Sequence, residues 1–168
     1  MNAVITRFLL AVALAAGTLA VQADDSRRRA VPTLPAYTQE CAACHVAYPP
    51  GLLPATSWQR LMVGLDRHYG SDASLDAATV AQLAAWLEAN AATGRRGREA
   101  PPDDRITRAD WFVREHREVP AAVWRHPAVR SAARCEACHT DADRGRFSEH
   151  ALRVPPGLDP ALARGWRE

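Results

Sequence analysis

The sequence predicts an all-α fold of two small lobes joined by a short linker. In the first half of the chain, apolar residues recur every three or four positions, and no stretch shows the period-two alternation that marks a strand. Residues 93–105 lack such periodicity and are rich in glycine, arginine and proline, which is the composition of a linker. One Cys-x-x-Cys-His motif lies on each side of this segment. We therefore expect an N-terminal lobe at residues 24–98 and a C-terminal lobe at residues 99–168.

Capping residues and apolar stripes predict three helices in the first lobe. Thr38 can cap a short helix that carries residues 41–45. A second helix begins near Ser57 and continues towards Gly70, since glycine commonly ends helices. The third helix begins at the predicted cap Asp76 and ends near residue 92.

The second lobe is predicted to be helical but less regular. We expect a helix that Thr107 caps and that ends near residue 115, followed by a short helical turn at residues 120–124. Residues 131–139 carry the second motif. Beyond this motif, glycines and prolines predict loop, with a final helical turn near residues 160–166.

The two Cys-x-x-Cys-His motifs use all four cysteines of the chain, so none remains for a disulfide. On a helix, the spacing of three and four residues places both cysteines and the histidine on one face. This pattern is typical of covalent haem c attachment, with two thioether bonds and an axial imidazole. Zinc binding is the alternative, but zinc ribbons separate their Cys pairs by about 15–20 residues, whereas about ninety lie between these pairs. We therefore predict two covalently bound haem c groups, attached through Cys41, Cys44, Cys135 and Cys138, with His45 and His139 as proximal iron ligands.

The sixth iron ligand decides whether each haem is closed or open to substrate. In the first lobe, His68 extends the apolar stripe of the second helix and is the preferred distal ligand. Met62 is its rival, although a methionine on such a face can equally fill a gap in the core. In the second lobe, His116 completes the apolar stripe of its helix and is preferred over His126 and His150. His126 precedes a proline, which favours extended backbone in a surface loop.

A proximal histidine normally donates its second ring N–H to a carbonyl or carboxylate group, which fixes the orientation of the ring. The proline-rich loop at residues 48–54 is placed to offer such a carbonyl to His45. The alternative is that these prolines only stiffen a surface turn.

The N-terminus predicts export. Arg7 is followed by an apolar run of about fourteen residues and by small residues up to Ala23, a pattern typical of a cleaved secretory signal at residues 1–23. The run is shorter than the roughly twenty residues that span a bilayer, and an uncleaved anchor is the alternative. We expect a mature, periplasmic protein that begins near Asp24.

The charge balance argues against one class of partner. The 21 basic residues are all arginine, and 19 acidic residues balance them, so the chain is nearly neutral. Proteins that bind nucleic acid usually present a strongly basic face. We expect no nucleic-acid partner.

Four blocks of the sequence are distinctive beyond the haem motifs. They are Cys-Ala-Ala-Cys-His-Val-Ala-Tyr-Pro-Pro-Gly-Leu-Leu-Pro, Leu-Asp-Arg-His-Tyr-Gly, Trp-Phe-Val-Arg-Glu-His-Arg-Glu-Val-Pro and Cys-Glu-Ala-Cys-His-Thr-Asp-Ala. Together they resemble the bacterial dihaem cytochrome c family abbreviated DHC. The resemblance implies a periplasmic electron carrier with two low-potential haems in two small cytochrome c-like helical domains, each iron held by two histidines. His45 and His139 match the proximal positions, and the blocks also contain His68 and His116.

The resemblance also implies the redox partners: a membrane cytochrome b as electron donor and a small oxygen-binding monohaem cytochrome c as electron acceptor. Two haems with both axial positions filled pass single electrons without binding substrate, so we expect an electron carrier without enzymatic activity and assign no catalytic residue. The alternatives are a dihaem peroxidase or reductase and a haem-based gas sensor, in which a distal histidine would leave the iron. An enzyme of that kind usually needs a longer chain to build its substrate pocket.

Overall fold

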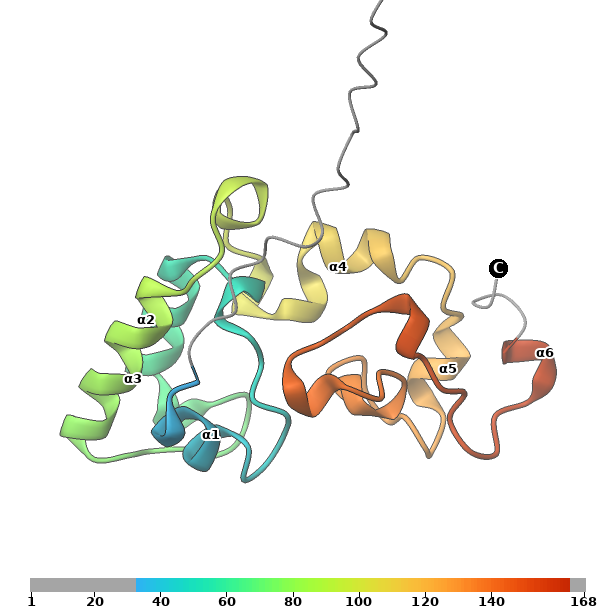
Figure 1. The fold of residues 1–168 in the computed structure, drawn as a ribbon, viewed down its shortest axis with the longest axis horizontal. Coiled ribbons are helices and arrows are strands. Elements are labelled where there is room, and N and C mark those ends of the chain that lie inside the picture. The colour runs from blue at the N-terminus through green and yellow to red at the C-terminus, as the bar shows by residue number, and fades with distance from the viewer. Residues whose placement is uncertain (1–32, 164–168) are drawn as a thin grey trace, which may run out of the picture. The chain divides into compact units, whose positions relative to one another are not determined.

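The computed structural model describes residues 33–163, in which short helices and 3-10 turns alternate with loops (Figure 1). The helices of this part are α1 (Pro35–Cys41), α2 (Ala55–Val63), α3 (Ala77–Ala89), α4 (Asp110–Glu115), α5 (Ala121–Arg125) and α6 (Pro160–Ala163). Within these residues β-type pairing is limited to two isolated bridges, His68–Ser71 and His139–Leu152, and no sheet forms. The prediction of an all-α fold is confirmed.

Helices α2 and α3 pack against each other and form the first hydrophobic core (Figure 1). The start of α3 is as predicted, because the carboxylate of Asp76 accepts hydrogen bonds from two backbone N–H groups of the first turn. Leu83 and Leu87 of α3 are each 1% exposed and pack in one cluster with Trp58 and Met62 of α2. Met62 therefore fills a position in the hydrophobic core, which was the alternative to its role as an iron ligand.

The second helix is shorter than predicted, and His68 lies outside it. α2 ends at Val63, because the N–H of Gly64 bonds back to two carbonyl groups of the last turn and glycine is a poor residue for continuing a helix. A 3-10 turn at Leu65–Arg67 follows, and His68 comes directly after it. The prediction of a continuous helix as far as Gly70 was wrong.

The first Cys-x-x-Cys-His motif leaves its helix after Cys41. α1 begins at Pro35, whose fixed φ suits the first turn of a helix, so Thr38 lies inside the helix and not at its cap. The backbone N–H of Ala42 makes the closing bond to Thr38, and residues 42–45 form a turn. The prediction that one helix from Thr38 carries residues 41–45 was therefore wrong.

A second hydrophobic cluster lies in the C-terminal half of the described chain. Val123 and Val129 are fully buried in it, and Cys138 of the second motif packs with them. The second motif itself lies on a 3-10 turn, Cys135–Ala137. The two haem motifs thus sit beside different hydrophobic clusters.

Helix boundaries in this half follow the prediction in part. α5 agrees with the helical turn expected at residues 120–124, and α6 begins where the final turn was expected. α4 begins at Asp110 and is shorter than predicted, because a separate 3-10 turn at Ile106–Arg108 takes up the region of the predicted cap Thr107.

The end of the predicted linker and the residue that follows it pack against the first lobe. Ile106 contacts this core, and the carboxylate of Asp104 accepts two hydrogen bonds, at 2.8 and 2.6 Å, from the guanidinium group of Arg60 on α2. The domain boundary between residues 98 and 99 stays a prediction.

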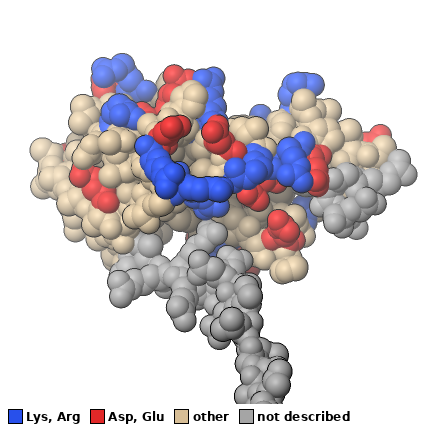
Figure 2. Space-filling model, turned by 90° about the horizontal axis from the view of Figure 1, so that it is seen from above, with Lys and Arg blue, Asp and Glu red and all other residues tan. Residues whose placement is uncertain are grey.

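Charged side chains of both signs share the surface. On the face drawn in Figure 2, basic side chains form a band that acidic side chains border closely. None of the helices in residues 33–163 is long and apolar enough to cross a membrane. The predicted signal at residues 1–23 and the start near Asp24 lie outside the described residues.

Candidate haem sites

The first site brings the rings of His45 and His68 close together. Their ring centres are 6.2 Å apart and their planes are inclined by 23°. A metal–imidazole bond is about 2 Å long and the ring centre lies about 1.2 Å beyond the nitrogen, so two imidazoles on opposite sides of one metal would have centres about 6.4 Å apart. The pair is therefore spaced to hold one metal ion between its rings.

His45 and His68 differ in how their ring nitrogens are hydrogen-bonded and buried. The Nδ1 of His45 lies 2.7 Å from the carbonyl oxygen of Val46, and donation by Nδ1–H leaves Nε2 with a free lone pair. The Nδ1 of His68 is buried without a hydrogen-bond partner in the described part of the chain. Burial first, and then His45 and Arg105, lower the pKa of His68, which favours the neutral imidazole that binds metals.

The carbonyl that orients His45 is not the one predicted. It belongs to Val46, the next residue, and not to the proline-rich loop 48–54. The loop acts through its first side chain instead, because the ring of Tyr48 stacks on the ring of His45 with 4.8 Å between centres and 21° between planes. Trp58 fixes the loop by donating Nε1–H to the carbonyl of Pro50 at 2.8 Å.

The second site pairs His116 with His139 at the same spacing. The ring centres are again 6.2 Å apart, but the planes are inclined by 75°. The Nδ1 of His116 lies 2.9 Å from the carbonyl oxygen of Phe112, and the two rings stack with centres 4.0 Å apart. Nδ1 of His139 is buried without a partner in the described residues, and burial, followed by the effect of His116, lowers the pKa of His139.

The alternative ligands Met62, His126 and His150 lie in other environments. Met62 packs in the first core, as described above. His126 accepts a hydrogen bond at Nδ1 from the backbone N–H of Ala128, and His150 is exposed. Among the histidines of residues 33–163, it is His116 whose ring contacts that of His139. This geometry supports His68 and His116 as distal ligands, and the four-histidine assignment stays a prediction.

The four cysteines of the two motifs form no disulfide and differ in exposure. Cys41 and Cys135 are half-buried, Cys138 is buried and Cys44 is exposed. Burial, with a nearby glutamate as the second cause, raises the pKa of both Cys41 and Cys135 to about 11. Before haem is attached, these two side chains are therefore neutral thiols at physiological pH, and attachment converts them to thioethers.

A protein-family model matches most of the described residues. The family model described as "Dihaem cytochrome c", DHC, matches residues 37–147, a span that contains both motifs and all four paired histidines. The chain belongs to the dihaem cytochrome c family. No curated protein sequence matches this dihaem cytochrome.

Solved structures agree with the family. The diheme cytochrome c of Shewanella baltica OS155 is 36% identical with a TM-score of 0.65, covering 74% of this chain and 94% of its own. Two structures of the Rhodobacter sphaeroides protein are 45% and 42% identical, with TM-scores of 0.60 and 0.62. Each covers 70% of this chain, and they cover 99% and 98% of their own chains respectively. The resemblance inferred from the four sequence blocks is confirmed.

The cofactor prediction is confirmed with the family: this dihaem cytochrome carries two covalent haem c groups, one at each Cys pair. When bound, haem c supplies an iron that takes up and releases one electron. The cysteines of the chain attach it, and hydrogen bonds and ring stacking orient the imidazoles of His45 and His116.

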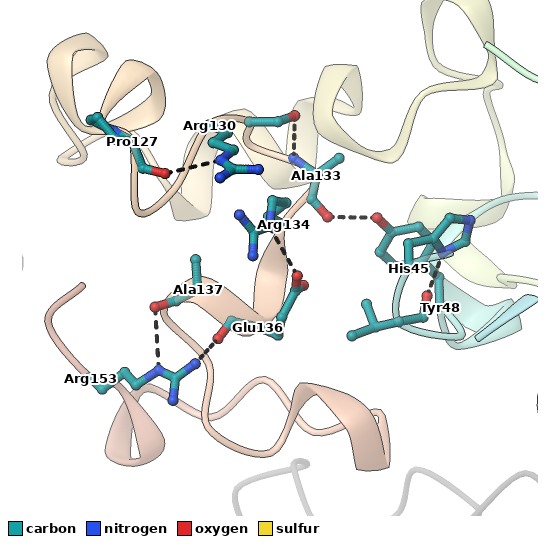
Figure 3. A network of polar contacts seen from close by, with 11 residues as sticks. His45, Tyr48, Pro127, Arg130, Ala133, Arg134, Glu136, Ala137 and Arg153 are labelled. Carbon is teal, nitrogen blue, oxygen red and sulfur yellow. Dashed lines mark hydrogen bonds and ion pairs between the residues drawn. The ribbon is translucent and has the colours of Figure 1, made fainter. Parts of the chain in front are cut away.

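Several contacts at the sites were not predicted. Phe147 meets His139 edge-on at 5.4 Å between ring centres. Arg153 holds the second motif from outside, donating to the carbonyls of Glu136 at 2.6 Å and Ala137 at 3.4 Å (Figure 3). Arginine occurs throughout this sequence, so the sequence pattern did not distinguish Arg153 as a residue that holds the motif. No sequence pattern predicted the stacking of Tyr48 on His45 either.

Proposed function

We propose that this dihaem cytochrome is a periplasmic, low-potential electron carrier, with His45 and His68 closing one haem and His116 and His139 closing the other. The observation that carries the proposal is the 6.2 Å spacing of both histidine pairs, which suits two axial imidazoles on one iron. With both histidines of a pair bound to it, each iron would have no position free for substrate.

The environment of the imidazoles supports a low potential. A methionine ligand raises the potential of a haem, and the one methionine among residues 33–163 is packed in the core. The carbonyls of Val46 and Phe112 accept hydrogen bonds from ring N–H groups, which makes the imidazoles stronger electron donors to iron and favours its ferric state.

The proposed role is electron transfer and not enzymatic catalysis. His116 would have to give up its stacking on Phe112 to open the second site, and His68 sits in a turn that the His68–Ser71 bridge closes. Ligands held in this way keep the coordination unchanged between oxidation states. The geometry therefore favours a carrier over a peroxidase, a reductase or a gas sensor.

The proposed partners are a membrane cytochrome b as donor and a small oxygen-binding monohaem cytochrome c as acceptor. Their support is the family resemblance, together with a mixed-charge surface that suits brief docking through small interfaces (Figure 2). A periplasmic location is consistent with covalent haem c and with the predicted signal at residues 1–23.

The test is a redox titration of the purified holoprotein combined with carbon monoxide binding. Both haems should titrate well below the potential of a His/Met cytochrome measured in parallel, and the reduced protein should not bind carbon monoxide. The same reduced protein should then transfer electrons to the monohaem cytochrome c in stopped-flow mixing. Rapid carbon monoxide binding by either haem would contradict the proposal, as would a potential in the range of the His/Met control.

A further inference from the structure

Tyr48 touches both haem-attachment segments at once. Its ring stacks on the imidazole of His45, with 4.8 Å between ring centres. Its hydroxyl donates a hydrogen bond of 2.6 Å to the carbonyl of Ala133, which lies 85 residues away in sequence and two residues before Cys135 (Figure 3). One side chain therefore links the first proximal histidine to the backbone of the second motif.

The position of Tyr48 is fixed independently of these two contacts. The hydroxyl of Tyr37 donates a hydrogen bond of 2.6 Å to the Tyr48 carbonyl, and Tyr37 is itself 6% exposed in the first core. Pro49 and Pro50 follow, and a proline restricts both its own φ and the residue before it. Tyr48 is therefore held at its backbone, its ring and its hydroxyl.

The receiving carbonyl is also held in place. The N–H of Ala133 donates to the hydroxyl of Ser131 at 3.1 Å, and the N–H of Arg134 donates to the Ser131 carbonyl at 3.0 Å. The next residue is Cys135, whose carbonyl accepts the N–H of His139 at 2.8 Å. A rigid turn thus connects the hydrogen bond of Tyr48 to both an attachment cysteine and the histidine of the second site.

We propose that Tyr48 is a positioning residue that provides the electronic contact between the two haem sites. The proposal rests on the proposed electron-carrier function. Its route runs from the imidazole of His45 to the ring of Tyr48, through the hydroxyl–carbonyl hydrogen bond, and along the backbone to Cys135. The rate of electron transfer falls steeply with distance across a gap between atoms that are not in contact. The stacked rings of His45 and Tyr48 and the Tyr48–Ala133 hydrogen bond provide contacts along this route.

The step itself is a single electron exchange. One electron leaves the reduced site and enters the oxidised site, so one is oxidised as the other is reduced. No bond forms or breaks, no proton moves, and Tyr48 is neither oxidised nor reduced. The role of Tyr48 is therefore to set the rate of exchange between the sites and not the potential of either.

Tyr48→Phe tests this role, because it removes the hydroxyl and keeps the stacked ring. Tyr69→Phe is the matched control. Tyr69 is also next to a predicted ligand of the first site, with 5.0 Å between its ring centre and that of His68. However, its hydroxyl donates to the carbonyls of Asp103 and Asp104 and not to the second motif.

The readout is the rate of electron exchange between the two haems in half-reduced holoprotein, measured from exchange broadening of the haem methyl signals in NMR. The ferric electron paramagnetic resonance (EPR) spectrum and both midpoint potentials are recorded for every variant. Tyr48→Phe should slow exchange several-fold with spectrum and potentials unchanged, and Tyr69→Phe should leave the rate at the wild-type value. Tyr48→Leu, which also removes the ring, should slow exchange further and alter the EPR signal of the His45 site.

Wild-type exchange in Tyr48→Phe would overturn the proposal, whatever the rate in Tyr48→Leu. Slower exchange in Tyr48→Phe together with altered spectra or potentials would also overturn it, because Tyr48 would then act only on structure. Failure of the electron-carrier function is a separate result: the wild-type protein would then lack two redox-active haems or would not exchange electrons between them.

Discussion

The two histidine pairs differ in the angle between their rings, and this difference predicts two distinct EPR signals. The planes are inclined by 23° in the His45–His68 pair and by 75° in the His116–His139 pair. Near-parallel imidazoles bound to one iron act on the same d orbital, separate its energy from that of its partner orbital and give an ordinary rhombic low-spin signal. Near-perpendicular imidazoles cancel each other's effect and give a strongly anisotropic low-spin signal. The ferric protein should therefore show one signal of each kind.

His116→Gly removes one ring of the near-perpendicular pair. The strongly anisotropic signal should disappear, a high-spin signal should replace it, and the rhombic signal should remain. Because one site of two is affected, half of the total iron should convert, as measured by spin quantification and visible absorption. Added imidazole should restore low-spin iron.

Rescue by imidazole should be incomplete at moderate concentration, since the native ring is pre-organised. Its hydrogen bond to the Phe112 carbonyl contributes about 0.5–1.5 kcal/mol and its stacking on Phe112 a similar amount. His126→Gly and His150→Gly are the controls and should leave both signals intact. Loss of the rhombic signal in His116→Gly, or two low-spin signals that persist unchanged, would show that the anisotropic signal does not come from the His116–His139 pair.

Three further predictions concern the contacts that hold the sites. Trp58→Phe removes the buried hydrogen bond to the Pro50 carbonyl and should lower the free energy of unfolding by about 1–3 kcal/mol in denaturant titration; an unchanged value would show that the bond is unimportant. Arg60 holds the pKa of Asp104 below its ordinary value, so the pair stabilises the fold above about pH 4 and this contribution is lost as the pH falls through the lowered pKa. A double-mutant cycle of Arg60→Gln and Asp104→Asn should therefore give about 0.5–1 kcal/mol at pH 7 and none in strong acid, and a coupling that survives acid would contradict the assignment. Arg153→Gln should speed amide hydrogen exchange in the second haem motif and leave the first motif unchanged; equal effects on both motifs would argue against a local role.

Local signals predicted the features that depend on neighbouring residues. The cap at Asp76 was predictable because an aspartate before a helical stripe bonds to N–H groups two and three residues on. The haem motifs were predictable for the same reason, since their chemistry lies within five residues. The helix from Ser57 to Gly70 failed because Gly64 interrupts an apolar stripe that continues past it, and periodicity alone does not detect such an end.

The pairing of His45 with His68 and of His116 with His139 was anticipated from apolar faces, although His68 reaches its position from a turn and not from a helix. Contacts between residues far apart in the sequence could not be predicted from apolar faces. The hydrogen bond from Tyr48 to Ala133 depends on how the two halves pack, and neither residue type signals such a bond. The Val46 carbonyl was missed because the turn after His45 is set by backbone geometry.

A crystal structure of the holoprotein, with anomalous scattering measured at the iron edge, tests the ligand assignment most directly. We expect two iron peaks, one between the rings of His45 and His68 and the other between those of His116 and His139. An iron bound by Met62, His126 or His150, or one with an open axial position, would contradict this assignment.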